Sequence, residues 1–158
     1  MGSATIVATA FALILLMITA YFLVAVVLTT AEVVSYAQQD KLNQQEQRIR
    51  TSININATSV VDPSILYSEI KNDGNAVISD FKYWDVYTGN NTGTSPSYYL
   101  KGDAEGEWNI TSISPDIINP GLLDPQEVLN ISIRYQGARP KWVQVTTPNG
   151  VSASAYVV

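Results

Sequence analysis

The chain of 158 residues contains neither cysteine nor histidine. The absence of cysteine excludes disulfides and thiolate chemistry, and without histidine the usual zinc ligands and any histidine acid–base relay are also missing. Basic residues are few, nine against fourteen acidic ones, and the formal net charge is −5. An acidic chain without a basic cluster is a poor nucleic-acid binder. We therefore expect no metal, no cofactor and no nucleic-acid partner.

Charged residues are also absent from residues 1–31, where Ala4 to Thr29 is almost wholly apolar. About 20 apolar residues cross a bilayer core, and a helix satisfies its own backbone there. The run is longer than the apolar region of a signal peptide, and no basic residue precedes it. We expect a retained transmembrane helix over 1–31. The predicted membrane-anchor residues are Ala4, Ile6, Phe11, Leu13, Leu16, Tyr21, Leu23 and Val27.

Residues 32–50 contain good helix formers and neither glycine nor proline, so the helix is predicted to continue as a stalk. Glu46 and Arg50 are spaced to pair on it. The apolar stripe is thin, which leaves two interpretations: a solvated spacer, or a helix that packs against copies of itself. Small residues would permit close approach within lipid. These are Ala4, Ala8, Ala10, Ala20 and Ala25.

From residue 51 onward the chain consists of short, partly alternating apolar segments with turn residues between them. The predicted strands are Thr51–Val60, Ile65–Lys71, a region over Ala76–Asp80 and Phe81–Thr88, Tyr98–Lys101, Trp108–Ser114, Val128–Tyr135, Trp142–Thr147 and Val151–Val157. Asn72-Asp73-Gly74-Asn75 predicts a tight turn after the second strand. The pattern is typical of a mainly β fold, an immunoglobulin-like antiparallel β-sandwich over 51–158.

The sequence gives conflicting signals about which side of the membrane this domain occupies. Lys41, Arg48 and Arg50 follow the apolar run, and the positive-inside rule would place them in the cytoplasm. The nearest lies about ten residues beyond the run, which weakens the rule here. Four Asn-x-Ser/Thr sequons favour the outside as N-glycosylation sites: Asn56, Asn90, Asn109 and Asn130. We expect an extracytoplasmic, glycosylated domain.

The densest group of acids is Asp103, Glu105 and Glu107. Carboxylates at alternate positions in a loop could face Ca²⁺, but the ligand series of an EF-hand is missing, so a solvated hairpin loop is the favoured interpretation. No glycine-rich phosphate loop, Gly-x-Ser-x-Gly elbow or metal-ligand spacing occurs. The sequence gives no positive sign of an enzyme.

Aromatic residues are the candidates for core packing and for partner contact. One or two of Trp84, Trp108 and Trp142 are expected in the core. Adjacent aromatics in a strand point to opposite faces, so at least one residue of Tyr83-Trp84 and of Tyr98-Tyr99 should point outward. Such tyrosines are either simple strand formers or contact residues. The predicted partner-contact residues are Tyr83, Tyr98 and Tyr99.

Several short segments carry more specific information than periodicity does. They are Met1-Gly2-Ser3, Ala37-Gln38, Arg48-Ile49-Arg50, Ile70-Lys71-Asn72-Asp73-Gly74-Asn75, Phe81-Lys82-Tyr83-Trp84-Asp85-Val86-Tyr87, Ile118-Asn119-Pro120-Gly121-Leu122-Leu123-Asp124-Pro125-Gln126-Glu127 and Trp142-Val143-Gln144-Val145-Thr146-Thr147-Pro148-Asn149-Gly150-Val151. In this order and spacing they resemble archaellar protein F, the FlaF/ArlF family of archaellum (archaeal flagellum) accessory proteins. The resemblance covers nearly the whole chain. Two positions depart from it: Ser3 stands where an apolar residue is expected, and Gln126 stands where glycine is expected.

The resemblance implies a non-enzymatic structural protein of archaeal motility. It implies one membrane helix and a β-sandwich outside the membrane, a plan similar to type IV pilins, located in the archaeal cell envelope. Its implied role is that of an anchoring or stator protein that binds the surface-layer (S-layer) protein and acts with the partner archaellum protein G. It also implies a homo-oligomer, a dimer formed through the sandwich.

Two other functions fit the same architecture. In a filament-forming type IV pilin-like subunit, an archaellin or pilin, the apolar helices would pack in a filament core after removal of a short basic leader. No basic leader precedes the apolar run here, an objection that disappears if the sequence is already the mature form. A start of the native protein other than Met1 or Gly2 would favour the pilin. A membrane-tethered carbohydrate-binding or hydrolytic module would need aromatics lining a groove and two acids within about 10 Å.

Overall fold

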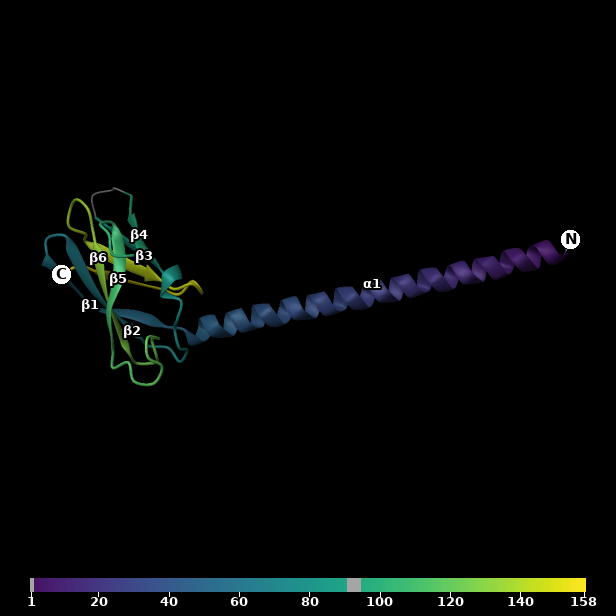
Figure 1. Cartoon of the computed structure of the whole chain (residues 1–158), viewed down its shortest axis with the longest axis horizontal. Coiled ribbons are helices and arrows are strands. Elements are labelled where there is room, and N and C mark those ends of the chain that lie inside the picture. Colours follow the sequence, from purple (N-terminus) through teal and green to yellow (C-terminus); the bar gives the residue numbers. More distant parts are fainter. Residues whose placement is uncertain (1, 91–94) are drawn as a thin grey trace. The chain divides into compact units, whose positions relative to one another are not determined.

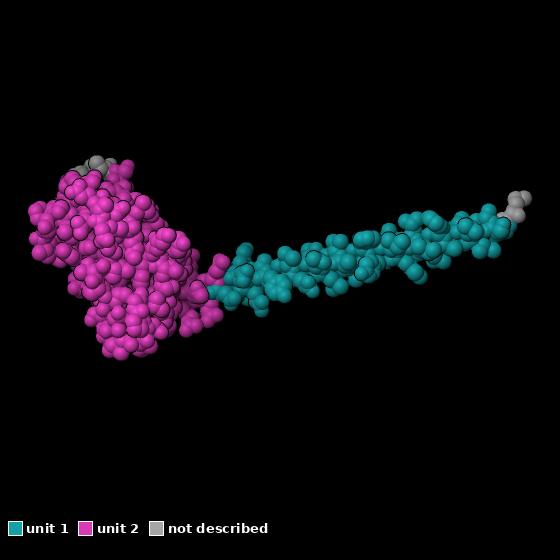
Figure 2. All heavy atoms as spheres, viewed as in Figure 1, with its two compact units in different colours: residues 1–43 teal, residues 44–158 magenta. Residues whose placement is uncertain are grey.

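The computed structural model describes residues 2–90 and 95–158 (Figure 1). The chain divides into two compact units, Met1–Asn43 and Gln44–Val158 (Figure 2). Helix α1 runs from Gly2 to Arg50 without a break, so it includes both the predicted membrane segment and the predicted stalk. Its 49 residues give a length of about 73 Å at the usual rise per residue. It is long and apolar enough to cross a membrane.

The threonine hydroxyl groups inside the apolar run of α1 are satisfied within the helix. The hydroxyl groups of Thr9, Thr19 and Thr29 each donate to a backbone carbonyl three or four residues earlier, at 2.8–3.0 Å. Lipid offers no partner for a hydroxyl group, so these internal bonds make the threonines compatible with a membrane. The eight predicted anchor residues are all exposed on the helix surface, as contact with lipid requires.

Two four-stranded antiparallel sheets form the second unit. One sheet has the order β1-β2-β6-β5 and the other β4-β3-β7-β8. The strands are β1 Ile53–Asp62, β2 Ile65–Asn72, β3 Asp85–Gly89, β4 Ser97–Lys101, β5 Glu107–Ser114, β6 Val128–Arg134, β7 Trp142–Thr146 and β8 Ser152–Tyr156. This matches the A-B-E-D and C′-C-F-G sheets of immunoglobulin-like domains, and it confirms the predicted sandwich.

The sandwich departs from the prediction in being a mixed and nearly closed sheet. The edge strands β4 and β5 of the two sheets meet in a short parallel pairing, Leu100 with Glu107 and Lys101 with Trp108. On the opposite side, the Thr58 hydroxyl group in β1 donates to the Tyr156 carbonyl in β8 at 2.9 Å. The eight strands therefore almost close on themselves around one core.

The core is built from the inward residues of both sheets. Trp84 and Trp108 are 1% and 0% exposed, and they fill its centre together with aliphatic residues from the strands. Indole rings bury large areas, so these two supply much of the packing that a domain without disulfides needs. Trp142 is only partly buried, which agrees with the prediction of one or two core tryptophans.

The predicted strand over 76–84 is wrong. This segment contains one isolated bridge, between Ile78 and Leu123, followed by the short 3₁₀ helix η1, Phe81–Tyr83. Its buried residues are Ile78, Phe81 and Trp84, a spacing of three that fits a turning chain and not a strand. The segment crosses from one sheet to the other, and β3 begins only at Asp85.

The turn Asn72–Asn75 does not join two paired strands but binds the end of α1. The backbone N–H groups of Asn75 and Ala76 donate to the Arg50 carbonyl at 2.8 and 3.1 Å. Those of Asp73 and Gly74 donate to the Ser52 carbonyl at 2.9 and 3.1 Å. A β-carbon at Gly74 would lie 2.4 Å from the Arg50 oxygen, so only glycine allows this approach.

Asn72 holds this turn in place from inside the domain. Its side chain is fully buried, and its Nδ2 donates to the carbonyls of Ala76 and Leu123 at 2.8 and 3.0 Å. Its Oδ1 accepts from the N–H of Gly74 at 3.0 Å. The backbone N–H of Asn72 also donates to the Glu127 carbonyl at 3.0 Å. One residue therefore connects β2, the turn and the loop before β6.

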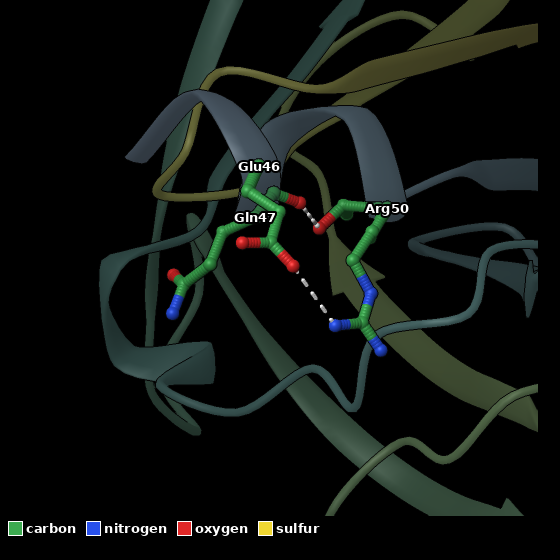
Figure 3. Close-up of polar contacts among 4 residues, drawn as sticks. Glu46, Gln47 and Arg50 are labelled. Atoms are coloured by element: carbon green, nitrogen blue, oxygen red, sulfur yellow. Dashed lines mark hydrogen bonds and ion pairs between the residues drawn. The ribbon is translucent and has the colours of Figure 1, made fainter. Parts of the chain in front are cut away.

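Side chains in and next to the last turn of α1 also form hydrogen bonds at this end of the helix. The Thr51 hydroxyl group donates to the Gln47 carbonyl at 2.7 Å and accepts from Asn149 Nδ2 at 2.8 Å. Arg50 pairs with Glu46 at 3.2 Å, as the sequence predicted, although both side chains are exposed and such pairs contribute little (Figure 3). We call the contacts of residues 47–52 with residues 72–76 and Asn149 the helix junction.

We predict that the fragment 44–158 folds without metal and is more stable than the fragment 51–158. The shorter fragment lacks the Arg50 and Gln47 carbonyls that accept hydrogen bonds at the junction, which should cost about 1–2 kcal/mol. Urea unfolding of both fragments, with and without a chelator, measures this. Equal stability, or unfolding by the chelator, would contradict the prediction.

Asn72→Ala should destabilise the domain by about 3 kcal/mol, because it removes three hydrogen bonds made by a fully buried side chain. Asn75→Ala is the matched control. The Asn75 side chain is exposed, so its loss should change the free energy of unfolding by less than about 0.5 kcal/mol. Urea unfolding of the two variants and the parent protein measures the free energy of unfolding of each. A similar loss in both variants would show that Asn72 has no special role.

Gln126 adopts φ 71°, the left-handed region that favours glycine, which is the residue that the family pattern expects here. Gln126→Gly should raise the free energy of unfolding by about 0.5–1 kcal/mol, because it relieves this conformation. Gln136→Gly, at a residue without positive φ, should lower it slightly through chain entropy. Thermal unfolding of both variants measures these changes. A change of the same sign in the free energy of unfolding of both variants would contradict the prediction that Gln126 is strained.

Candidate functional site

One outer face of the sandwich gathers aromatic side chains. On the sheet β4-β3-β7-β8 the inward residues Val86, Thr88, Tyr99, Val143 and Val145 are buried, so the residues between them point outward. The strand register aligns Tyr98, Tyr87 and Gln144 in one row and Trp142 with Tyr156 in the next. We call this surface the aromatic face. It consists of Tyr87, Tyr98, Leu100, Trp142, Gln144 and Tyr156.

The rings of this face are held in place by neighbouring strands. Tyr87 and Tyr98 pack with ring centroids 5.1 Å apart, and the Tyr98 hydroxyl group donates to Asp85 Oδ1 at 3.1 Å. Partial burial and the Asp85 carboxylate, which accepts from the hydroxyl group, raise the pKa of Tyr98 above its ordinary value. A β-carbon at Gly89 would lie 2.5 Å from the Trp142 ring, so the ring rests directly on strand β3.

The aromatic face carries almost no charge. Among the described residues of its four strands, Asp85 and the exposed Lys101 are the only charged ones, and strand alternation turns only Asp85 toward this face. Large aromatics with few charges are the composition of the buried centre of a protein–protein interface. Such rings are also the usual energetic hot spots of binding. This face therefore has the chemistry to bind another protein.

The structure separates the three predicted contact residues. Tyr98 lies on the aromatic face and is 48% exposed, and Tyr83, in η1, is 66% exposed beside Lys82. The prediction that Tyr99 contacts a partner is corrected by its burial. Tyr99 is 4% exposed, and its hydroxyl group forms a hydrogen bond with the Thr88 hydroxyl group at 3.1 Å inside the domain. Strand alternation sends it inward because its neighbour Tyr98 points outward.

Sequence reasoning did not select Tyr87, Trp142 or Tyr156. Each lies on a different strand, and only the register brings them together. Aromatic residues in three separate strands give no local pattern from which this neighbourhood could be read. Alternation predicts which face of its own strand each residue occupies, but it does not predict which residues of other strands lie beside it.

The other outer face, on the sheet β1-β2-β6-β5, is polar and carries three of the four sequons. Asn56, Asn109 and Asn130 all occupy outward positions of its strands. Asn90 follows β3, and the rest of its sequon, Asn91 and Thr92, lies outside the described residues. The two outer faces of the sandwich thus differ sharply in chemistry.

The acidic loop forms no metal site within the described part of the chain. Glu107 Oε2 accepts the N–H of Ala104 at 2.8 Å, and Asp103 accepts the amide of Asn109, so the loop is tied by its own hydrogen bonds. No group of three potential ligands is placed to hold a metal among the residues described. A small hollow beside Tyr99 is lined by neutral residues only, which does not fit a hydrolytic site with two acids.

Comparison with known proteins gives one relative over the whole chain. No protein-family model matches the sequence. An uncharacterized protein of Archaeoglobus fulgidus is 30% identical over 159 residues, covering 98% of this chain and 95% of its own length. The similarity therefore extends over the segments that form both the helix and the sandwich in this chain.

The fold is similar to that of a solved archaellum protein. The archaellum periplasmic stator protein FlaG from Sulfolobus acidocaldarius is similar with a TM-score of 0.52 and 25% identity, covering 66% of this chain and 97% of FlaG. The FlaF–FlaG stator complex from the same organism gives a TM-score of 0.49 and 22% identity, covering 65% of this chain and 85% of that one. The segments singled out in the sequence and the likeness to FlaG agree: the chain is similar to the archaellum accessory proteins of the FlaF/FlaG type.

Proposed function

We propose that this protein is a stator component that anchors the archaellum machinery to the surface layer. Helix α1 crosses the membrane, the sandwich lies outside it, and the aromatic face binds the surface-layer protein. The observation that carries the proposal is the nearly uncharged aromatic face on a domain whose first element is a membrane-length helix. The likeness to a periplasmic stator protein supports it.

A stator has a mechanical task and needs no catalytic group. A rotating filament exerts a reaction torque, and something fixed to the cell wall must resist it. A membrane helix joined by hydrogen bonds to a sandwich can pass this torque on, because the strands of the sandwich are held by many ladder bonds that must break together. The helix junction supplies the connection between α1 and the strands.

The aromatic face fits a protein partner better than a charged ligand. Binding would bury Trp142, Tyr87 and Tyr98 while it desolvates a single carboxylate, Asp85, which already accepts the Tyr98 hydroxyl group. The free-energy cost of desolvating this face is therefore small, and the apolar area that binding buries contributes to affinity. The partner archaellum protein G and a second copy of this chain are further candidates for contact in the same assembly.

The proposal predicts that full-length protein in detergent captures solubilised cognate surface-layer protein. Tyr98→Ala should weaken this binding at least tenfold, about 1.4 kcal/mol, because it removes a ring and its hydrogen bond from the contact. Tyr67→Ala is the matched control, because Tyr67 points outward from β2 on the opposite face. Biolayer interferometry with immobilised surface-layer protein measures the affinities.

Folding of both variants is checked by circular dichroism before the comparison. No binding by the parent protein would reject the surface layer as its partner. Equal loss of binding in Tyr98→Ala and Tyr67→Ala, with both variants folded, would place the interface elsewhere. Loss only in Tyr67→Ala would move it to the polar face.

A further inference from the structure

The sequons of this chain are not equivalent in the folded domain. Asn56, Asn109 and Asn130 share the outer face of the sheet β1-β2-β6-β5, opposite the aromatic face. A glycan linked to an asparagine is bulky and needs open space above the side chain. The surroundings of each carboxamide therefore decide which sequon suits a sugar in the native structure.

Asn56 is the sequon residue with the most open surroundings. It lies in β1, where the pairing with β2 shifts between Ile55 and Ala57, so it is the extra residue of a β-bulge. Its side chain is exposed, and its only hydrogen bond within the described chain is at Oδ1, which accepts weakly from Asn54 at 3.5 Å. The nitrogen Nδ2, the atom that a sugar would take, makes no bond to any described residue.

Asn109 and Asn130 are engaged with their neighbours. Asn109 is half-buried; its Nδ2 donates to Asp103 and its Oδ1 accepts the N–H of Ile110 at 2.8 Å. Asn130 is half-buried in β6, between β2 and β5, and its Nδ2 donates to the Ser112 hydroxyl group at 3.1 Å. A sugar on either nitrogen would compete with these bonds and crowd the flanking strands.

We propose that Asn56 is an N-glycosylation site and that Asn109 and Asn130 stay unmodified. In the reaction, Asn56 Nδ2 forms a bond to the anomeric carbon of an oligosaccharide carried on a lipid phosphate. The bond from that carbon to the phosphate oxygen breaks, the lipid phosphate leaves with the electron pair, and Nδ2 loses one proton. A membrane-bound oligosaccharyltransferase of the host catalyses the step outside the cytoplasm.

The glycan would cover the polar face beside the bulge and leave the aromatic face bare. Its position follows from Asn56 lying on the sheet opposite to Trp142 and Tyr98. Sugars on the polar face would keep that side solvated, so the protein partner is directed to the other sheet. This inference rests on the extracytoplasmic placement in the proposed function.

The test uses the full-length chain expressed in an archaeal host whose envelope proteins carry N-glycans. Site-resolved glycopeptide mass spectrometry of the purified protein should find sugar on Asn56 and none on Asn109 or Asn130. Asn56→Gln, which keeps a carboxamide, should lose that mass increment completely. Thr58→Ser keeps both the sequon and a hydroxyl group, so it should retain the sugar.

Protease treatment of sealed cells from the same culture separates this inference from the proposed function. If the domain is accessible outside and Asn56 carries no sugar, the site inference fails while the stator proposal stands. If the domain is protected inside, both fail. Sugar on Asn109 or Asn130 would also overturn the inference, because it would show that their hydrogen bonds do not exclude modification.

Discussion

The helix junction is the contact on which the proposed mechanical role of this protein depends. The last carbonyls of a helix have no partner within the helix. Here the Arg50 carbonyl is bound by the N–H groups of Asn75 and Ala76, which follow β2 directly. The end of α1 and the sheet are therefore joined by backbone bonds of fixed direction.

The sandwich uses the alternation of its strands to make two different surfaces around one core. Inward positions supply the apolar core, with Trp84 and Trp108 at its centre. Outward positions of one sheet are aromatic and nearly uncharged, and those of the other are polar and carry sequons. Because the side-chain period of a strand is two, the same short segments set both the stability of the domain and its recognition surfaces.

Local patterns predicted most of the fold, and long-range pairing decided the rest. The apolar run predicted a helix, and alternation with turn residues predicted every strand except β3 within a few residues. The segment 76–84 was misread because it passes between the sheets, so its buried residues do not alternate. The chemistry of the turn at Asn72–Asn75 was recognised, but nothing local shows that its N–H groups bind the end of a helix. Tyr87 and Trp142 likewise meet only through register.

Because the sheet is nearly closed, we expect a partner to bind the outer face of a sheet and not to pair with an edge strand. Exposed edge strands invite pairing with another chain. In the described chain β4 pairs with β5, and β1 lies beside β8, where the Thr58 hydroxyl group bonds the Tyr156 carbonyl. Two register shifts in β1 further disrupt a regular edge. Strand addition would have to separate β1 from β8, whereas binding to the aromatic face leaves every ladder intact. Binding through the aromatic face suits a stator under load, because the contacts with the partner are then separate from the hydrogen bonds that hold the strands together.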